Sequence, residues 1–456
     1  MEMRAGEIVK AQLDYFNTNI TKNLDFRARQ LRKLKYALKE SEKLLTESIY
    51  VDFGKSEFDT YTNELALIYG DIRQALKNLR RWARRRKTGT NSVNMPGRSY
   101  IIPEPLGVSL IIGAWNYPYQ LSLCPVVAAI AAGCTVVLKP SELSAAASRA
   151  MAKIVAENFD PRYFTVVEGG ITETTELLEQ KFDKIFFTGS VSVGRIVYKA
   201  AAENLTPVTL ELGGKSPAFV TAGCKMDICV KRLVWAKFLN AGQTCIAPDY
   251  VLVHRSVKER FLAQLANEIG KGDYSAGGGN YVRVINRKHM EWLAGMLDRD
   301  KIYMGGNYDM EQGYFEPTVM TGVAFDDRVM REKIFGPILP VIEYNILDEA
   351  IAQVKSRPKP LSCYVFTADK KVKDKILHEI SFGGGAVNDA VMHVANNRLP
   401  FGGVGSSGIG AYHGEAGFRA FSHYKSILEK STLLEPGLKY PPHTPKKLSL
   451  IRKIMG

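Results

Sequence analysis

The sequence predicts an α/β protein with a Rossmann-like parallel sheet, a second α/β domain and a small bridging segment. From about residue 99 onward, short runs of β-branched and other apolar residues alternate with stretches that favour helices. Strands that alternate with helices are typical of parallel sheets joined by crossover connections. The chain of 456 residues is long enough for two or three domains, each with its own core.

Several amphipathic helices are predicted for the segment that ends near residue 87. Its apolar residues recur at spacings of three and four, as in Leu31, Leu34 and Leu38, and proline and glycine are scarce. Such spacing places apolar side chains on one face of a helix. We therefore expect helices ahead of the first strand.

The strand-to-helix unit is clearest at 182–205, FDKIFFTGSVSVGRIVYKAAAENL. A strand is expected to end at Phe187, and a helix to begin near Val193 after a Thr-Gly-Ser turn. The alternation resumes after LELGGKSP at 210–217 and continues to about residue 380. The stretch LPFGGVGSSGIGAYHG at 399–414 contains six glycines and is predicted to be a loop.

Composition excludes several classes of protein. The apolar fraction of 46% and the charged fraction of 24% are those of an ordinary globular protein. Six cysteines without a CxxC pair indicate reduced thiols and a cytoplasmic protein, and the histidines show no metal-binding spacing, so no metal is expected. The N-terminus lacks the apolar core of a secretory signal, and the longest apolar window, 124–138, is too short to cross a bilayer.

Positive charge is concentrated in two places. The formal net charge is +14, and basic residues cluster in RRWARRRK at 80–87 and in the tail KYPPHTPKKLSLIRKIMG at 439–456. Such runs are commonly solvated helix faces, and the functional alternative is attraction to an anionic surface. Beyond Trp82 no aromatic residue is interleaved with them, so nucleic acid is not expected as a partner. Peripheral contact of the tail with an anionic membrane remains as a hypothesis.

The segment FLNAGQTC at 238–245 presents Cys245 behind a small, polar approach. A thiol reacts as a thiolate, so a nucleophilic cysteine needs a partly open polar surrounding, which Gly242, Gln243 and Thr244 are expected to supply. A small packing residue is the alternative. Glu211 favours the functional interpretation, because it closes an apolar run directly before a glycine pair, where a carboxylate is expected to face a cleft.

Three further turns follow strand ends. Gly189, Ser190 and Gly194 lie where a helix begins, and the free N–H groups there favour a phosphate, although an ordinary turn is the alternative. Lys139 and Glu142 follow TVVL, where the carboxylate could accept hydrogen bonds from a ribose or form a surface ion pair.

The third turn is GAWNYP, in which Asn116 follows a strand end. An amide held at such a point can stabilise an oxyanion, a role worth about 3 kcal/mol per donor. Asparagine is also common at this position for turn formation alone.

Seven motifs occur in order between residues 113 and 410: GAWNYP, VLKPSE, FTGSxxxG, LELGGKSP, GQTC, IFGP and PFGGVGxSGxG. Together they resemble the aldehyde dehydrogenase superfamily over nearly the whole chain. The compact N-terminus, GQTCIAPDY at 242–250 and the YHG that ends at Gly414 are similar to its class 3 or fatty aldehyde branch. That resemblance implies a homodimer that oxidises medium-chain, long-chain or aromatic aldehydes with NAD or NADP.

Roles for individual residues also come from the resemblance. It implies that Cys245 attacks the aldehyde carbon, that Asn116 and the Cys245 N–H hold the oxyanion, and that Glu211 activates the water that hydrolyses the thioester. The cofactor-binding residues that it implies are Trp115, Lys139, Glu142, Gly189, Ser190, Val193, Gly194, Leu212, Lys333 and Phe335. Tyr117, Trp235 and Phe401 are expected to form an apolar substrate pocket.

The resemblance also divides the chain. We expect N-terminal helices and the cofactor domain in 1–209, with a bridging segment near 88–104, and the catalytic domain with Cys245 in 210–390. Residues 391–435 are expected to return to the cofactor domain and to bridge a dimer, and 436–456 to form the basic tail.

One position departs from the family pattern. Family members usually read Glu-Ile-Phe-Gly-Pro, with the glutamate accepting hydrogen bonds from the nicotinamide ribose, whereas this chain has Lys333 there. An ammonium can only donate. Glu332 cannot replace the missing acceptor, because neighbouring side chains point in different directions. We expect a more loosely held nicotinamide; a lysine turned to solvent is the alternative.

The same residues also bear on two competing functions. Transfer of the thioester to coenzyme A is disfavoured by Glu211, whose use is to activate water. A membrane-associated scaffold without catalysis is disfavoured because Cys245, Glu211 and Asn116 occur together. Glu142 would repel the 2′-phosphate of NADP, so NAD is favoured and NADP remains open.

Overall fold

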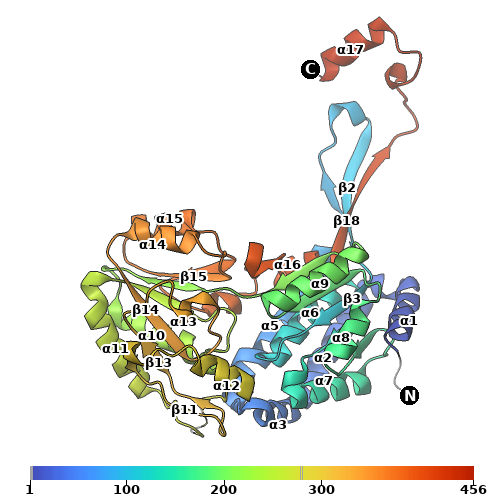
Figure 1. The fold of residues 1–456 in the computed structure, drawn as a ribbon. Helices are drawn as coiled ribbons and strands as arrows, with labels where there is room; N and C mark the ends of the chain where they lie inside the picture. The colour runs from blue at the N-terminus through green and yellow to red at the C-terminus, as the bar shows by residue number, and fades with distance from the viewer. Residues whose placement is uncertain (1–3, 278, 280, 456) are drawn as a thin grey trace.

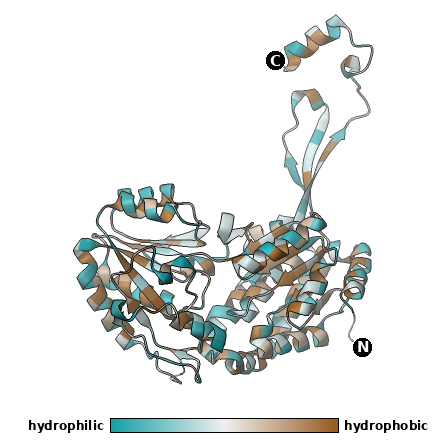
Figure 2. Ribbon diagram, viewed as in Figure 1, coloured by the Kyte–Doolittle hydropathy of each residue, from teal (hydrophilic) through white to brown (hydrophobic). Residues whose placement is uncertain are grey.

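Two α/β lobes and a projecting arm make up the chain (Figure 1). This computed structural model describes residues 4–277, 279 and 281–455. Figure 2 shows apolar strands inside both lobes and hydrophilic faces on the outer helices. The predicted α/β class, with parallel sheets at the centre of each lobe, is confirmed.

The first lobe is built on a six-stranded sheet in the order β17-β7-β6-β3-β4-β5. All pairs in it are parallel except the pair of β7 with β17. The strands are β3 (Val108–Ile112), β4 (Thr135–Lys139), β5 (Phe164–Val166), β6 (Lys184–Thr188), β7 (Val208–Glu211) and β17 (Gly408–Ile409). Because their carboxyl ends meet at one edge, the residues that follow them lie close together there.

Helices cover both faces of this sheet, because successive strand side chains point to opposite sides. Val136 packs in the core that includes helices α2, α5, α6 and α7, whereas Val137 packs in the core that includes α1, α8 and α9. These helices are α1 (Ala5–Asn17), α2 (Leu24–Glu40), α5 (Ala66–Ala83), α6 (Pro118–Ala132), α7 (Ala145–Asn158), α8 (Ile171–Leu178) and α9 (Val191–Glu203). The strand before α9 ends one residue later than expected, and α9 itself begins two residues earlier.

The second lobe is built on a seven-stranded sheet in the order β10-β13-β14-β9-β8-β15-β16. Only its edge strand β10 is antiparallel to its neighbour. The strands are β8 (Pro217–Val220), β9 (Tyr250–His254), β10 (Ile302–Met304), β13 (Thr318–Met320), β14 (Ile338–Tyr344), β15 (Ser362–Phe366) and β16 (Gly384–Val387). Helices α10 (Met226–Phe238) and α11 (Lys258–Lys271) pack on one face, and α12 (Arg287–Ala294), α14 (Leu347–Lys355) and α15 (Lys370–Glu379) pack on the other.

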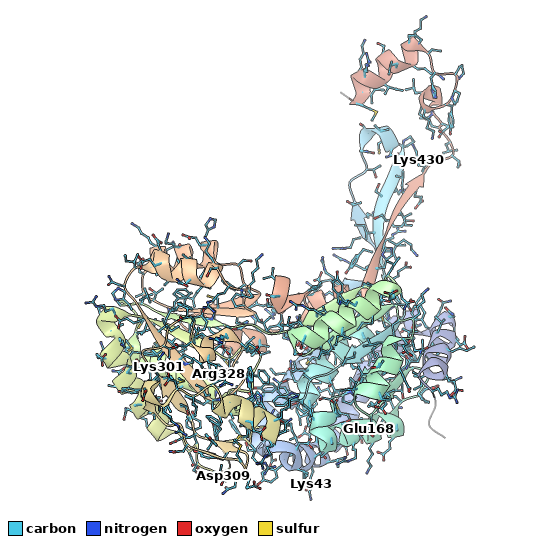
Figure 3. The ribbon with its side chains drawn as sticks, viewed as in Figure 1. Lys43, Glu168, Lys301, Asp309, Arg328 and Lys430 are labelled. Atoms are coloured by element: carbon cyan, nitrogen blue, oxygen red, sulfur yellow. The ribbon has the colours of Figure 1, made fainter. Side chains whose placement is uncertain are left out.

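The arm is a three-stranded antiparallel sheet that extends away from both lobes (Figure 1). It consists of β1 (Arg86–Thr88), β2 (Gly97–Pro105) and β18 (Ser422–Lys430), and Figure 3 shows Lys430 far from the lobes. The run SYIIPEP at 99–105, with which the alternation of strands and helices was expected to begin, therefore belongs to the antiparallel arm and not to a parallel sheet. The basic run at 80–87 is likewise divided between the end of α5 and the arm, where Arg85 lies over the Tyr100 ring, so it is not one solvated helix face.

Beyond the arm, the tail forms helix α17 (Pro445–Met455), which lies apart from both lobes (Figure 1). Leu448, Leu450 and Ile454 on this helix are exposed. Within the residues that the structure describes, none of the helices combines the length and hydropathy needed to cross a membrane.

The glycine-rich stretch at 399–414 is more ordered than a loop. Phe401 and Tyr412 form a β-bridge, and β17 pairs with β7 through Gly408 and Glu211. Gly408 has a φ of +157° and lies so close to Leu210 that a Cβ would meet the Leu210 carbonyl oxygen at 2.4 Å. Glycine is therefore required for this strand to approach β7.

A buried ion pair fixes the start of α6. Lys55 Nζ and Glu64 Oε1 are 2.6 Å apart, and their side chains are 1% and 0% exposed. The other carboxylate oxygen of Glu64 accepts hydrogen bonds from the Tyr119 and Gln120 N–H groups, which are free donors at the start of the helix. Lys55 also donates to the Asn116 carbonyl at 3.2 Å. The pair therefore positions the turn that contains Asn116.

Replacing Glu64 with alanine should lower the free energy of unfolding by about 3 kcal/mol or more, because Lys55 would remain buried without its partner. Urea denaturation would measure the loss. The control is Glu47→Ala, which removes the exposed partner of Lys43, whose side chain is 88% exposed (Figure 3). That change should alter stability by less than about 1 kcal/mol. Equal losses in the two variants would contradict the assignment of the buried pair.

Candidate active site

Cys245 lies in a strained turn that follows α10. Asn240, Ala241 and Gly242 have φ values of +55°, +50° and +72°, so three successive residues adopt the left-handed conformation. A Cβ on Gly242 would meet the carbonyl oxygen of Gly336 at 2.2 Å, so only glycine permits the IFGP segment to pack here. Backbone strain of this kind persists where the surrounding contacts enforce it, and it is concentrated at functional sites.

The polar residues before Cys245 do not supply the open surrounding that was expected of them. Gln243 is fully buried, and its amide donates to the Asn240 and Arg283 carbonyls while accepting from the Ile285 N–H. The Thr244 hydroxyl is 2.7 Å from the Tyr117 hydroxyl. Both side chains therefore hold the turn, and the expectation that they would leave the surrounding of the thiol partly open is wrong.

The Asn116 side chain reaches this turn from the first lobe. Its amide donates to the Gln243 carbonyl at 2.9 Å, and Asn240 donates back to the Asn116 carbonyl at 3.0 Å. An asparagine amide has two N–H groups, so one remains for another acceptor. The Asn116 amide is thus bonded to the turn two residues before Cys245 and can present its other N–H group beside the cysteine.

Glu211 ends β7, between β6 and β17. Its side chain is 2% exposed, and neither carboxylate oxygen has a hydrogen-bond partner among the described residues. Burial raises the pKa of Glu211 well above its usual range. The carboxyl is close enough to Cys245 to raise the pKa of that thiol as well. Glu211 is therefore a buried, titratable group beside the cysteine.

The Cys245 thiol is half-buried, and three influences act on its ionisation. Burial raises its pKa most strongly, Lys333 lowers it, and Glu211 raises it. Hydrogen bonds from the Cys245 and Ile246 N–H groups also favour the thiolate. The balance keeps the pKa above that of a free thiol, and a nearby positive charge increases the fraction of thiolate.

Lys333 is turned into the site and not to solvent. Its Nζ donates to the Cys245 carbonyl at 2.6 Å and lies 5.1 Å from the centre of the Phe335 ring. The alternative of a lysine turned to solvent is therefore wrong. Burial lowers the pKa of the Lys333 ammonium, while Cys245 and Asp249 act in the opposite direction.

An aromatic group lies next to Lys333. The Trp115 and Phe335 rings are in edge contact with centres 5.4 Å apart, and His289 lies 6.4 Å from Trp115. His289 also bonds to the Phe335 carbonyl at 2.7 Å through Nε2. Trp115, Lys333 and Phe335, three of the predicted cofactor residues, therefore lie together.

The N-terminus of α9 holds four more of the predicted cofactor residues, and Leu212, which follows β7, packs against it. The Ser190 hydroxyl accepts from the Val193 N–H, and Val193 itself is 41% exposed. A Cβ on Gly194 would meet Leu212 at 2.5 Å, and a Cβ on Gly189 would meet the Phe187 ring at 2.5 Å. The two glycines therefore permit close packing, and the free N–H groups of the helix suit an anionic group such as a pyrophosphate.

Lys139 and Glu142 lie at the end of the neighbouring strand β4. Their charged groups are 3.8 Å apart, but the Lys139 side chain is only 2% exposed whereas that of Glu142 is 48% exposed. The alternative of a surface ion pair is thus wrong for Lys139, whose Nζ donates to the Pro140 carbonyl. A buried ammonium, a half-exposed carboxylate and a free helix N-terminus at one sheet edge provide the donors and acceptors that fit a dinucleotide.

The three residues predicted for the substrate pocket lie in different surroundings. Tyr117 is buried beside Thr244, and Phe401 is buried between the rings of His393 and His413. Trp235 is 40% exposed on α10, and within the described part of the chain its ring stacks on neither of the other two. The structure therefore brings Tyr117 close to the cysteine turn and leaves Trp235 at the surface.

A cavity of about 1060 Å³ opens next to these residues, between α5, α6 and the segment 394–419. Gln120, in the first turn of α6, and Pro400, next to Phe401, are among its lining residues. Charged residues that include Arg73, Lys77 and Arg81 also line it, and these three are exposed. The cavity therefore lies on the first lobe beside α6 and has exposed charged residues in its wall.

Sequence reasoning missed several residues of the site: Lys55, Glu64, Asn240, Asp249 and His289. Asn240 had a local signal, since asparagine tolerates the left-handed conformation and stands next to Ala-Gly in the sequence. The other four are joined to the site by contacts between distant segments, which leave no local pattern.

The chain matches the aldehyde dehydrogenase family over residues 3–427. It is similar to 4,4′-diaponeurosporen-aldehyde dehydrogenase of Staphylococcus aureus, with 45% identity over 95% of each chain. Aldehyde dehydrogenase family 3 member A2 of Pongo abelii is 43% identical over 98% of this chain and 92% of the relative. The dimeric NADP-preferring aldehyde dehydrogenase of Rattus norvegicus is 41% identical over 97% of this chain and 98% of the relative.

A solved structure agrees with these relationships. The substrate-bound state of Staphylococcus aureus AldH superposes with a TM-score of 0.97 and 43% identity, and the match covers 100% of both chains. Both the fold and the order of the motifs are thus accounted for over the whole chain. The chain therefore belongs to the aldehyde dehydrogenase family, in the branch of its family 3 relatives, and is an NAD(P)-dependent oxidoreductase that acts on aldehydes.

Proposed function

We propose that the protein oxidises aldehydes to carboxylic acids through a covalent intermediate on Cys245. The observation that carries the proposal is the convergence of three groups on one strained turn: the Cys245 thiol, the Asn116 amide and the buried Glu211 carboxyl. A nucleophile, an oxyanion donor and a general base near one another are what acyl chemistry on a thiol requires.

In this mechanism the Cys245 thiolate attacks the aldehyde carbon and forms a thiohemiacetal. The second N–H of the Asn116 amide and the Cys245 backbone N–H hold the oxyanion. When bound, NAD or NADP would supply the acceptor for the hydride that the thiohemiacetal loses as it becomes a thioester. Glu211 then takes a proton from water, which attacks the thioester and releases the acid and the thiol.

The cofactor is proposed to lie along the carboxyl edge of the first sheet. The N-terminus of α9 with Gly189, Ser190 and Gly194 would hold the pyrophosphate, and Val193 would lie against the adenine face. Leu212 would support this helix start by packing against Gly194. Lys139 and Glu142 would bond the adenine ribose, and Trp115, Lys333 and Phe335 would surround the nicotinamide end. The half-exposed Glu142 carboxylate would lie near the adenine ribose, and its negative charge would repel a 2′-phosphate there. This favours NAD over NADP.

The substrate is proposed to be a medium-chain, long-chain or aromatic aldehyde. The buried rings of Tyr117 and Phe401 offer an apolar surface near the cysteine turn, with Trp235 farther out on α10. The cavity that Gln120 and Pro400 line has the volume to admit a long chain. We propose that it is the entrance for the aldehyde.

The two lobes and the arm are proposed to have separate roles. The first lobe would bind the cofactor, and the second, which carries Cys245, would provide the nucleophile. The arm has exposed strand edges away from the lobes, so it is suited to pair with a second copy in a homodimer. Equilibrium sedimentation would reveal the dimer.

A series of aldehydes of increasing chain length, assayed by NADH and NADPH absorbance, tests the main proposal. The value of kcat/KM should rise with chain length, and turnover should vanish in Cys245→Ala because no thiohemiacetal can form. Cofactor binding, followed by fluorescence, should remain. The control is Cys224→Ala, which removes another half-buried free thiol from the same lobe and should leave turnover at the parental level. Parental turnover in Cys245→Ala would refute the mechanism.

The pH dependence should report Glu211. Its raised pKa means that the carboxyl is protonated at the lower end of the pH range, where it cannot take a proton from water, so kcat for hydrolysis should rise as the pH passes through that pKa. Glu211→Gln should abolish this rise and slow the steady state on the order of 10²-fold or more after a burst of NADH.

Stopped-flow absorbance measures both phases of that experiment, and acid should form without coenzyme A. The exposed Glu203, at the end of α9, provides the control: Glu203→Gln should keep the parental profile. A Glu211→Gln variant with unchanged kcat at every pH would remove the general base from the mechanism.

The tail is proposed to make peripheral contact with anionic membranes. Helix α17 exposes Leu448, Leu450 and Ile454 together with Arg452 and Lys453. Each basic residue near an anionic surface contributes about 1 kcal/mol. Arg452→Glu with Lys453→Glu should therefore weaken co-sedimentation with acidic vesicles about tenfold or more. Reversal of Lys370 and Lys371, both exposed on α15, is the control, and equal binding to neutral vesicles would refute the idea.

A further inference from the structure

The ammonium of Lys333 lies between two segments of the site. Its Nζ donates to the Cys245 carbonyl at 2.6 Å. A Cβ added at Gly213, two residues after Glu211, would lie 3.1 Å from the same nitrogen and 3.2 Å from Cδ of Lys333. The side chain therefore passes over the glycine pair that follows β7 and ends at the main chain of the cysteine.

The segment around Lys333 is held rigidly, so the direction of this side chain is determined. The Ile334 N–H donates to Asp249 at 3.1 Å, and Ile334 is fully buried. Phe335 adopts a φ of +52°, which is unusual for a residue other than glycine, and its carbonyl is bonded to His289. Lys215 bonds Asp249 and the Glu332 carbonyl as well. Contacts on both sides of Lys333 thus direct its side chain toward the cysteine turn.

The charged and titratable groups that face Cys245 come from several elements. Tyr117, Tyr364 and Tyr412 are near the thiol, but burial raises the pKa of each, so they are neutral at ordinary pH. Glu211 disfavours the thiolate, and Lys333 favours it. Farther out, Asp249 favours the charged form of Lys333 and Lys215 disfavours it. The sign of the charge at 333 therefore opposes that of Glu211.

We infer that Lys333 is a positioning residue for the proposed nucleophile: its bond to the Cys245 carbonyl fixes the turn, and its charge favours the thiolate over the thiol. The proton that the thiol loses passes to water, and the ammonium keeps its own. The inference rests on the proposed role of Cys245. It assigns to Lys333 a task toward the thiol, in place of the ribose contact that a glutamate makes at this position in the family.

Alkylation of Cys245 tests the inference without cofactor or turnover. The rate of reaction with iodoacetamide is measured in the cofactor-free protein at about six pH values between about 5 and 10. Mass spectrometry of the Cys245 peptide follows the reaction. Lys333→Gln should slow alkylation about three- to tenfold below the inflection and move the inflection to higher pH. Lys333→Arg, which keeps the charge and a donor, should stay within about twofold of the parent, and Lys333→Glu should be slower than Lys333→Gln.

The matched control is Arg331→Gln, which removes an exposed positive charge two residues away. Its alkylation profile should coincide with that of the parent, since an exposed charge is screened by solvent. A role in folding alone would change thermal stability and leave the inflection pH where it was.

Two results would overturn the inference: coincident profiles for the parent, Lys333→Gln and Lys333→Glu, or a shift in Arg331→Gln as large as that in Lys333→Gln. If Lys333→Gln does not fold, Gly213→Ala replaces it, because the added Cβ would displace the ammonium and keep its charge on the protein. This variant should shift the inflection in the same direction by a smaller amount, and no shift would overturn the inference. Failure of the proposed function is a separate outcome, namely parental turnover in Cys245→Ala.

Discussion

The carbonyl and amide of Asn116 join the two lobes at the site. The carbonyl accepts hydrogen bonds from Lys55 in the N-terminal helical region and from Asn240 in the cysteine turn, and the amide donates to Gln243. All four side chains are buried, so the loss of one partner would leave a polar group without water. The position of Cys245 relative to the first sheet, and hence to Glu211 at the end of β7, depends on these bonds.

The same exclusion of water makes the charges around Cys245 effective. Glu211 has no hydrogen-bond partner among the described residues, and burial alone accounts for its raised pKa. In such surroundings a charge acts more strongly than it would in water. Burial raises the pKa of the Cys245 thiol, and the Lys333 ammonium on the second lobe acts in the opposite direction. The buried frame and the charged groups are therefore parts of one arrangement.

Local chemistry explains which parts were predictable from the sequence. The Ser190 helix start, the Asn116 turn and the end of the strand at Glu211 each have a signature within a few residues, and the structure has these elements within two residues of the expected positions. The alternation of strands and helices from residue 99 onward indicated a parallel sheet, whereas the run at 99–105 lies in β2, which is antiparallel to β18. This pairing joins segments more than 300 residues apart and therefore leaves no local signal. Gln243 was misjudged for the same reason, since its partner Arg283 lies outside the local pattern.

Lys333 shows how a change at one position can affect two halves of a reaction in opposite directions. A glutamate there could accept from the nicotinamide ribose, but its charge would add to that of Glu211 and further disfavour the thiolate. The lysine removes that acceptor and, because its Nζ is already bonded to the Cys245 carbonyl, directs its charge to the thiol. A loosely held nicotinamide and a favoured thiolate would then both follow from one ammonium. Tighter cofactor binding in Lys333→Glu would then be accompanied by a less reactive Cys245.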